Sequence, residues 1–170
     1  ENNKAIGVKL SDGSKIFSNK VVSNLNPKLL FKKLVDKNDV DSEYLRKILN
    51  YKCGSGTFRM NVALSELPNF NCLPGIKVAE HHKSGIVIAP SLTYMDKAFT
   101  DAKQYGWSKN PIVEMLIPST VDSTLAPEGK HVASLFCQQF APKLPDNKSW
   151  HGEKLKAADT IIDTVNDFDP

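Results

Sequence analysis

Two alternating apolar runs on either side of a short polar turn form the first clear pattern in the chain. Ile6, Val8 and Leu10 alternate with polar or small residues, and Asp12-Gly13 follows. A period of two predicts a half-buried strand, and Asp-Gly favours a hairpin turn because glycine adopts positive φ without a Cβ clash. We therefore expect a hairpin whose second strand covers residues 16–23.

Two helices are predicted after this hairpin. Asn26 is a good N-cap and Pro27 suits the first helical position, where a missing N–H costs nothing. The apolar stripe of this first helix consists of Leu29, Leu30 and Leu34. A second helix is expected over 43–50, with Asp41 or Ser42 as its cap.

The rest of the chain predicts four strands and two long helices. We expect strands over 57–64, 85–89, 112–117 and 131–140, and helices over 92–105 and 149–166. The inner stripes of these helices are Met95, Ala98, Phe99 and Ala102 in the first, and Leu155, Ala158, Ile161, Ile162 and Val165 in the second. Residues 65–83 form a long loop, and loops of this length are often functional or mobile.

The central strands alternate in polarity and do not run as continuous Val/Ile blocks. In 57–64, for example, Phe58 and Met60 face one way while Arg59 and Asn61 face the other. This pattern favours an α+β fold with a mixed, mainly antiparallel sheet and helices packed on one face.

Composition is typical of a globular protein and bears on whether the chain binds nucleic acid. Of its 170 residues, 41% are hydrophobic and 24% are charged, which is enough apolar material for a core. The net charge is only +3, and the lysines are scattered and not clustered with aromatic residues. A solvated surface is therefore expected, with no nucleic-acid partner.

The three cysteines, Cys53, Cys72 and Cys137, are too few and too far apart for a disulfide framework. They fit a reducing compartment, so we expect a cytoplasmic protein. No apolar run approaches the ~20 residues that span a bilayer. We therefore expect no transmembrane segment, and any membrane contact would be peripheral. The chain begins at Glu1 in a pattern that is already strand-like at Ile6. We expect an internal fragment of a longer protein.

Candidate catalytic and metal-binding groups are sparse. His81 and His82 are adjacent and lack a second ligand pair at zinc-site spacing, so we interpret them as surface-loop histidines. Ser55 lies between two glycines but outside any nucleophile-elbow motif, and a flexible turn explains it equally well. The sequence predicts no catalytic residue and no metal ligand in this chain.

Arg59 and Asn61 leave two interpretations open. They share the polar face of the strand 57–64, and that face is either solvated or the roof of a ligand cavity, where a few polar groups fix orientation. Gln138 would lie on the same surface in one register, and Glu114 poses the same choice.

Two stretches resemble known motifs. Residues 12–27, DGSKIFSNKVVSNLNP, resemble the Asp-Gly…Val-Val-Ser-Asn-x-x-Pro strand of the phytoene dehydrogenase-like FAD-dependent oxidoreductases. Residues 113–142 resemble a second block of that family, and the positions that make this match specific are Asp122, Thr124, Leu125, Ala126, Pro127, Gly129 and His131. The resemblance extends over nearly the whole chain.

The resemblance implies a two-domain flavoprotein that uses FAD on an apolar, polyene-like substrate. Residues 1–34 would be the border strands and first helix of the FAD-binding domain, and 35–170 the substrate-binding domain. Asn24, Asn26 and Pro27 would contact the flavin at the domain border, and Arg59 and Asn61 would line the substrate cavity.

The family's Gly-x-Gly-x-x-Gly turn, which holds the FAD pyrophosphate, does not occur in this sequence. We therefore expect the chain alone to retain no FAD and to be inactive. Its expected partners are an apolar small molecule and the remaining FAD domain of the same longer protein. A homo-oligomer is also compatible with the sequence. The alternative is a self-contained, non-enzymatic module that binds a ligand or a protein.

Overall fold

The computed structural model describes residues 4–54 and 56–169. The chain divides into two compact units, Glu1–Cys53 and Gly54–Pro170. The first unit contains β1 (Gly7–Lys9), β2 (Lys15–Phe17), α1 (Pro27–Leu29) continued by a π-helical turn (Leu30–Leu34), a 3₁₀ turn (Lys37–Asp39) and α2 (Ser42–Asn50). The predicted border between a flavin and a substrate domain at residues 34 and 35 stays a prediction.

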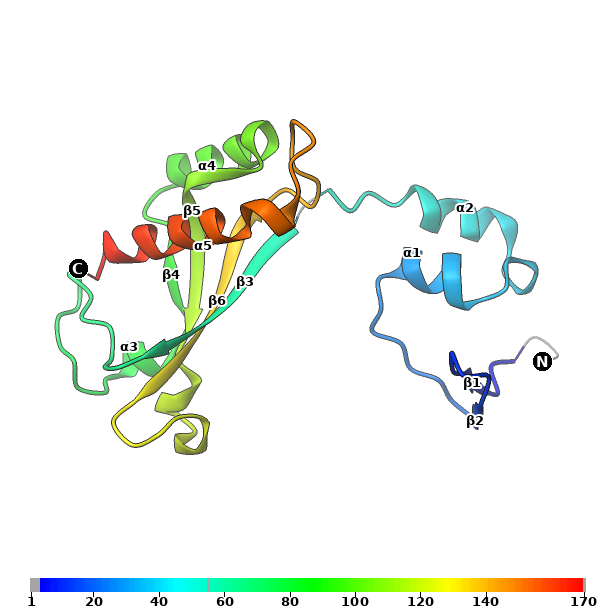
Figure 1. Ribbon diagram of the computed structural model, residues 1–170, viewed down its shortest axis with the longest axis horizontal. Helices are drawn as coiled ribbons and strands as arrows, with labels where there is room; N and C mark the ends of the chain where they lie inside the picture. Colours follow the sequence, from blue (N-terminus) through cyan, green and yellow to red (C-terminus); the bar gives the residue numbers. More distant parts are fainter. Residues whose placement is uncertain (1–3, 55, 170) are drawn as a thin grey trace. The chain divides into compact units, whose positions relative to one another are not determined.

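The second unit holds the larger sheet and the long helices (Figure 1). Its elements are β3 (Gly56–Leu64), α3 (Glu80–Lys83), β4 (Ile86–Ile88), α4 (Leu92–Tyr105), β5 (Trp107–Leu116), 3₁₀ turns at Pro118–Thr120 and Ser123–Leu125, β6 (His131–Phe140) and α5 (Trp150–Asn166). Helices and antiparallel strands thus occur together, which confirms the predicted α+β class.

The N-terminal hairpin forms around the predicted Asp-Gly turn, but its second strand is shorter than expected. Gly13 has φ +89°, and the Asp12 carboxylate accepts hydrogen bonds from the Ser14 hydroxyl (2.6 Å) and N–H (2.8 Å). The prediction that this strand reaches residue 23 was wrong, since β2 ends at Phe17. After β2, the Ser18 hydroxyl donates to the Lys20 carbonyl at 2.7 Å and accepts the Lys20 N–H at 3.3 Å.

Both predicted helix starts in the first unit are confirmed. The Asn26 side chain accepts the N–H of Lys28 at 2.9 Å, and Pro27 is the first residue of α1. Of the two proposed caps for α2, Asp41 is used, because its carboxylate accepts the N–H of Tyr44 at 2.8 Å. These side chains satisfy backbone donors that have no partner inside the helix.

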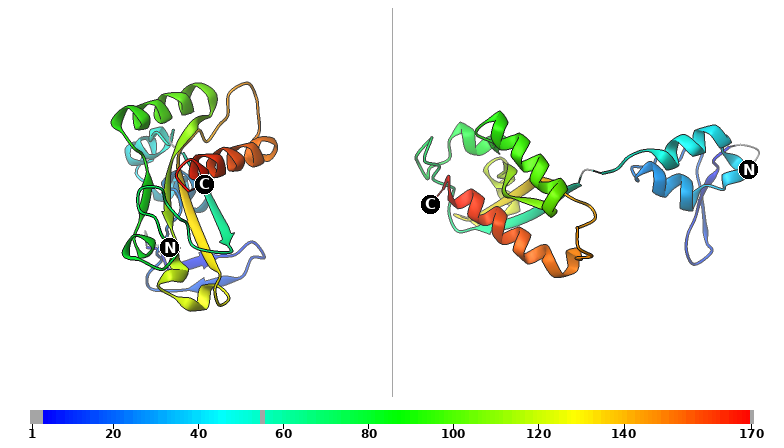
Figure 2. Two further views of the ribbon diagram at one scale, coloured as in Figure 1. Left: turned by 90° about the vertical axis from the view of Figure 1, so that its left-hand side faces the viewer. Right: turned by 90° about the horizontal axis from the view of Figure 1, so that it is seen from above.

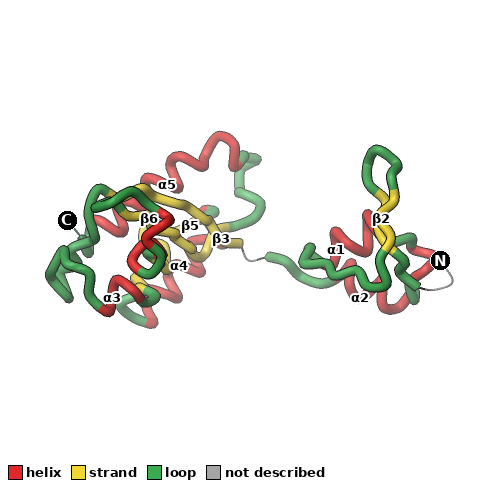
Figure 3. The backbone as a smooth tube through the Cα atoms, turned by 90° about the horizontal axis from the view of Figure 1, so that it is seen from below, coloured by secondary structure: helices red, strands yellow, loops and turns green. Residues whose placement is uncertain are grey.

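The main sheet has four antiparallel strands in the order β3-β6-β5-β4. Strand β3 alternates as predicted, with Phe58, Met60, Val62 and Leu64 half-buried and the residues between them exposed. Figures 2 and 3 show the strands side by side, with the long helix α5 running across them. One face of the sheet is therefore the core face, and the other is more open.

The core lies between this inner face and α5. Buried side chains of the strands, among them Val113, Leu135 and Cys137, pack with Ala157 and Ile161 of α5. The predicted inner stripe of α5 was partly wrong, since Leu155 is 71% exposed. The buried line runs through residues 157, 161 and 164, one helical face at i, i+4 and i+7.

Helix α4 spans the predicted residues and ends at Gly106, whose φ of +101° suits a helix end that only glycine adopts easily. Its buried side is narrower than predicted, because Ala98 and Ala102 are buried while Met95 and Phe99 are each about 40% exposed. Small residues at the contact let the helix lie close to its neighbours.

Strand β5 begins at Trp107, five residues earlier than predicted. The predicted start at Ile112 follows Pro111, which removes a ladder donor. The structure tolerates this proline at an irregularity of the β5–β6 pairing between Trp107 and Ile112.

The Pro111 carbonyl accepts a hydrogen bond from the Tyr94 hydroxyl at 2.9 Å. Burial raises the pKa of Tyr94 to about 12, so the donor stays protonated.

The stretch 65–83 is anchored, and the prediction of surface histidines was wrong for His82. His82 is 0% exposed, with Nε2 2.9 Å from the Pro68 carbonyl and Nδ1 accepting the Ala79 N–H at 3.2 Å. The Thr120 hydroxyl donates to the His82 carbonyl at 3.0 Å. Leu67 and Phe70 enter the core from the same stretch. Sequence polarity alone gave no sign that a histidine would anchor this loop.

Candidate functional site

The open face of the sheet brings together the polar residues whose register the sequence could not decide. Arg59 and Asn61 of β3 lie opposite Phe136 and Ser134 of β6, and Phe136 also lies opposite Glu114 of β5. Arg59 and Asn61 are exposed. The register thus places the predicted lining residues on one surface with Glu114.

Arg59 is held over this face by two contacts. Its guanidinium carbon lies 5.3 Å from the centre of the Phe136 ring, a cation–π distance. Its Nη2 donates to the Ser134 hydroxyl at 3.2 Å. Among the described residues, Arg59 forms no ion pair with a carboxylate. Its charge is therefore available above an apolar ring.

Gln138 and Glu114 form the second polar group of the open face. The Gln138 side-chain amide donates to the Glu114 carboxylate at 2.5 Å, and both residues are half-buried. Burial, with a contribution from Glu114, raises the pKa of Cys137 to about 12. Cys137 is thus a protonated core thiol and not a reactive thiolate.

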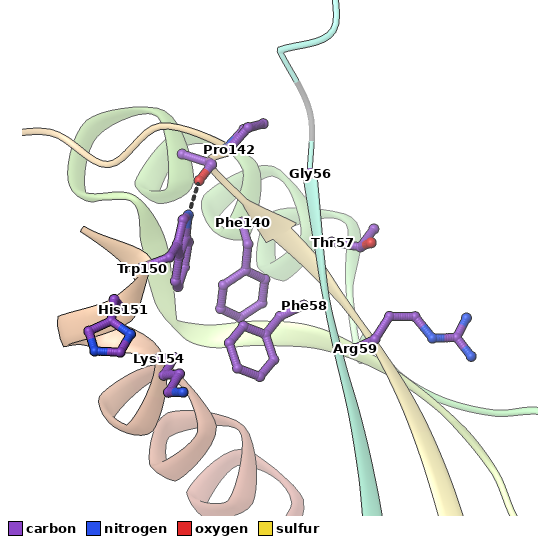
Figure 4. A pocket seen from close by; sticks show the side chains of 10 residues that line it. Gly56, Thr57, Phe58, Arg59, Phe140, Pro142, Trp150, His151 and Lys154 are labelled. Carbon is purple, nitrogen blue, oxygen red and sulfur yellow. Dashed lines mark hydrogen bonds between the residues drawn. The ribbon is translucent and has the colours of Figure 1, made fainter. Parts of the chain in front are cut away.

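An aromatic cleft lies on the other side of β3, where the sequence gave no prediction. It has a volume of about 620 Å³ and is formed at the start of β3, the end of β6 and the first turns of α5. In Figure 4, Phe58, Phe140 and Trp150 gather on one side of β3 while the side chain of Arg59 points to the other. Arg59 lines the cleft and also belongs to the open face, so the two surfaces meet at this residue.

The aromatic wall of this cleft is closely packed. The Phe58 ring lies 5.3 Å from Phe140 and 6.0 Å from Trp150, and Trp107 stacks behind Trp150 at 5.6 Å. The Trp150 indole N–H donates to the Ala141 carbonyl at 2.9 Å. Because its polar atom is bonded, Trp150 offers the cleft an apolar ring.

The lining of the cleft includes three basic residues, Arg59 of β3 and His151 and Lys154 of α5. All three are exposed. None of the described residues that line the cleft is acidic. The sequence did not reveal this site because its parts lie some 90 residues apart. The sequence features that could have pointed to this site are two aromatic residues, Phe58 near the start of a strand and Trp150 at the start of a helix.

The residues predicted at the flavin border lie in the first unit. The Asn26 amide is engaged locally, capping α1 with its oxygen and donating to the Cys53 sulfur at 3.6 Å with its nitrogen. Pro27 starts α1. Asn24 is exposed and lines a hollow of about 720 Å³ formed by first-unit residues alone. Of the three, Asn24 is the one placed in a concave surface.

The part of the chain that the structure describes shows no candidate metal site. No group of three or more His, Cys, Asp or Glu residues there is arranged to hold a metal ion. Ser55 lies outside the described residues. Among residues 4–54 and 56–169, no helix is both long and apolar enough to cross a membrane.

A dinucleotide cofactor would need a strand, a glycine-rich turn and a helix in sequence. Gly54 instead precedes the strand β3 and Gly56 is the first residue of that strand, where a Cβ would lie 2.6 Å from the Phe140 carbonyl oxygen. That glycine is therefore explained by the close approach of β6. These two glycines therefore do not form a pyrophosphate-binding turn.

The chain is similar along almost its whole length to proteins of an oxidoreductase family, as the two motif blocks predict. In particular, it is related to pyridine nucleotide-disulfide oxidoreductase domain-containing protein 2. Identity to the Mus musculus protein is 34% over 172 residues, covering 98% of this chain and 30% of that protein. The Rattus norvegicus protein is 32% identical over 169 residues, covering 96% and 29%.

A weaker match extends the same relationship. Prolycopene isomerase, chloroplastic, of Daucus carota is 25% identical over 167 residues, covering 95% of this chain and 24% of that protein. No protein-family model matches the chain. The chain thus spans about 30% of the length of the curated relatives first named.

Proposed function

We propose that this chain supplies the substrate-binding domain, with a flavin-border segment, of an FAD-dependent oxidoreductase that acts on an apolar, polyene-like substrate. The observation that carries the proposal is that nearly the whole chain matches about 30% of the length of two proteins that are oxidoreductases by name. The weaker relative is by name an isomerase of a polyene, prolycopene, which supports the substrate class.

The open sheet face is the surface that we assign to the substrate. Its side chains alternate between apolar and polar groups, and a site for an apolar molecule needs a few polar groups to fix orientation. Arg59 over Phe136 and Gln138 on Glu114 are such groups, each held by a contact within the sheet. Asn61, next to them on β3, completes the proposed lining.

FAD, supplied by the rest of a longer protein, would carry the electron chemistry, and this chain would bind and orient the substrate. Asn24, Asn26 and Pro27 are proposed as border contacts, with Asn24 the best placed because it lines the first-unit hollow. The partners would be the apolar substrate and the flavin-binding remainder of that protein.

Photolabelling tests the assignment of the open face. A neutral apolar probe, a diazirine-bearing long-chain alcohol, is irradiated with the purified chain, and labelled residues are located by mass spectrometry. We expect labels on the open-face positions of β3 and β6, around Asn61 and Phe136. The variant Phe136→Asp should remove them because it places a charge in the middle of the face. Labels confined to other surfaces would refute this assignment.

Flavin retention tests the division of labour. The chain purified in the presence of FAD should carry no bound flavin absorbance near 450 nm after gel filtration, since the pyrophosphate-binding turn is not in this sequence. A stoichiometric yellow chromophore on the purified chain would contradict the proposal. The alternative, a self-contained binding module, predicts equal stability of both units, and the proteolysis experiment in the Discussion separates the two.

A further inference from the structure

The cleft behind β3 carries a chemistry that the proposed substrate face does not need. Its wall is aromatic and its lining includes the basic residues Arg59, His151 and Lys154, while in Figure 4 the rings lie on the side of β3 away from the Arg59 side chain. We infer that this cleft binds an amphipathic carboxylate, a molecule with an apolar, unsaturated body and one terminal anionic group. The inference does not rest on the proposed function, because it is argued from the three rings and Lys154, none of which belongs to the proposed substrate face.

The apolar body of the ligand would lie against the rings of Phe58, Phe140 and Trp150. Phe140 is 2% exposed and forms the floor, while Phe58 and Trp150 are half-buried and form the walls. A volume of about 620 Å³ is within the range of small-molecule sites, which are mostly apolar with a few polar groups. Conjugated or aromatic groups would gain offset-stacked or edge-to-face contacts with these rings.

The anionic end is indicated by the charges at the rim. Lys154 lies one turn after His151 on α5, and among the described residues neither side chain is in an ion pair. No carboxylate is among the described lining residues to neutralise them. An anionic group beside Lys154 would meet an uncompensated charge, whereas a cationic group would be repelled.

The same helix offers a matched control. Lys156 is also exposed, but it pairs with Glu153 at 3.6 Å and does not line the cleft. Replacing Lys156 therefore removes an equal charge from the same helix without touching the proposed site. The contrast between Lys154 and Lys156 isolates the effect of position from that of net charge.

The test compares an acid with its neutral counterpart. The probes are cis-parinaric acid and the corresponding alcohol, which have the same tetraene chain and differ in the terminal group. Binding to the chain is followed through quenching of Trp107 and Trp150, the only two tryptophans in the sequence, of which Trp150 lines the cleft. We expect the acid to bind roughly two- to fivefold more tightly, the usual value of an exposed ion pair.

Variants then assign the preference to the cleft. Lys154→Ala should reduce the preference for the acid and leave alcohol binding unchanged, and Lys156→Ala should preserve the preference. Phe58→Ala should weaken both probes, with circular dichroism used to establish that the fold is kept. Salt should reduce the preference because the lysine is exposed.

Three results would overturn the inference: equal binding of acid and alcohol, equal loss in the Lys154 and Lys156 variants, or no binding of either probe. None of these results bears on labelling of the open face by a neutral probe. Failure of this inference and failure of the proposed function are therefore distinguishable.

Discussion

The two units differ in how their apolar side chains are used. Among the described residues 4–53, none is buried, and side chains such as Phe17 and Val22 are 70% and 95% exposed. In the second unit Val113, Cys137 and Ile161 are 0% exposed. Both units have well-formed turns and helix caps. Similar local hydrogen bonding therefore occurs in two units whose apolar side chains are buried to very different degrees.

This difference separates local order from stability. A two-stranded hairpin and short helices are marginal alone, because burial of apolar faces supplies most of the stability of such elements. The hydrogen bonds of the Asp12 turn and the Asn26 cap define conformations in the first unit, but none of its described residues is buried to support them. The exposed apolar surface of this unit fits a segment that packs against protein beyond itself.

The largest expected effect is in proteolysis. Thermolysin, which cuts beside large apolar residues, should cleave the first unit at sites such as Phe17 and Val22 roughly tenfold or more faster than the second, because little free energy opposes local opening there. A time course with mass spectrometry would show early loss of first-unit peptides and a persistent fragment covering most of 56–169.

An internal comparison is available in the second unit. Leu73, Ile76 and Val78 are also more than half exposed, but their loop is anchored by Phe70 and His82. If exposure alone governed cleavage, this loop would be cut as fast as the first unit. Equal protection of the two units would instead favour a self-contained module.

Core truncation should give the next largest contrast. Ile161→Ala in α5 should lower the free energy of unfolding by about 2–5 kcal/mol, because it leaves a cavity in a packed core. Leu34→Ala in the first unit, where the side chain is 64% exposed, should change it by less than about 0.5 kcal/mol. Urea unfolding of each variant measures both.

Leu155→Ala is the control within the second unit. Leu155 lies on the same helix and was predicted to face inward, but it is 71% exposed, so its truncation should also cost less than about 0.5 kcal/mol. A loss comparable to that of Ile161→Ala would mean that α5 is rotated relative to the structure described.

Sequence patterns anticipated most of the fold because its signals are local. The α4 boundaries, the β6 boundaries and the caps at Asn26 and Asp41 follow from periodicity, glycine and side-chain hydrogen bonds within a few residues. The inner face of α5 was harder, because Leu155 fits a helical stripe as well as Ile161 does. Only the packing of α5 against the sheet determines that the helix face containing Ala157 is the buried one.

The candidate sites were less predictable because they depend on register and on distant contacts. Sequence placed Arg59 and Asn61 on one face, but their association with Glu114 depends on strand pairing across β6. The burial of His82 depends on the Pro68 carbonyl, 14 residues earlier. The aromatic cleft joins Phe58 to Trp150, and no periodic pattern links positions so far apart.

The smallest effect concerns acid stability and again contrasts the units. Asp101 on α4 is partly buried; burial raises its pKa, but hydrogen bonds from Lys97 and Ser108 outweigh this and hold the pKa below the usual range of an aspartate. Asp12 in the hairpin turn also has a lowered pKa, through hydrogen bonds from Ser14, but it is fully exposed in a unit without a core.

A carboxyl group whose pKa is lowered by folding stabilises the folded state above the unfolded pKa, and this contribution is lost as the pH falls through the folded value. Wild-type stability should therefore fall below about pH 4 partly through Asp101. Asp101→Asn should cost about 1 kcal/mol at pH 7 and have a smaller further loss between pH 5 and pH 3. Asp12→Asn should leave that loss unchanged. Urea unfolding across this pH range decides between the two carboxylates, and an equal effect of both variants would remove the contrast between the units.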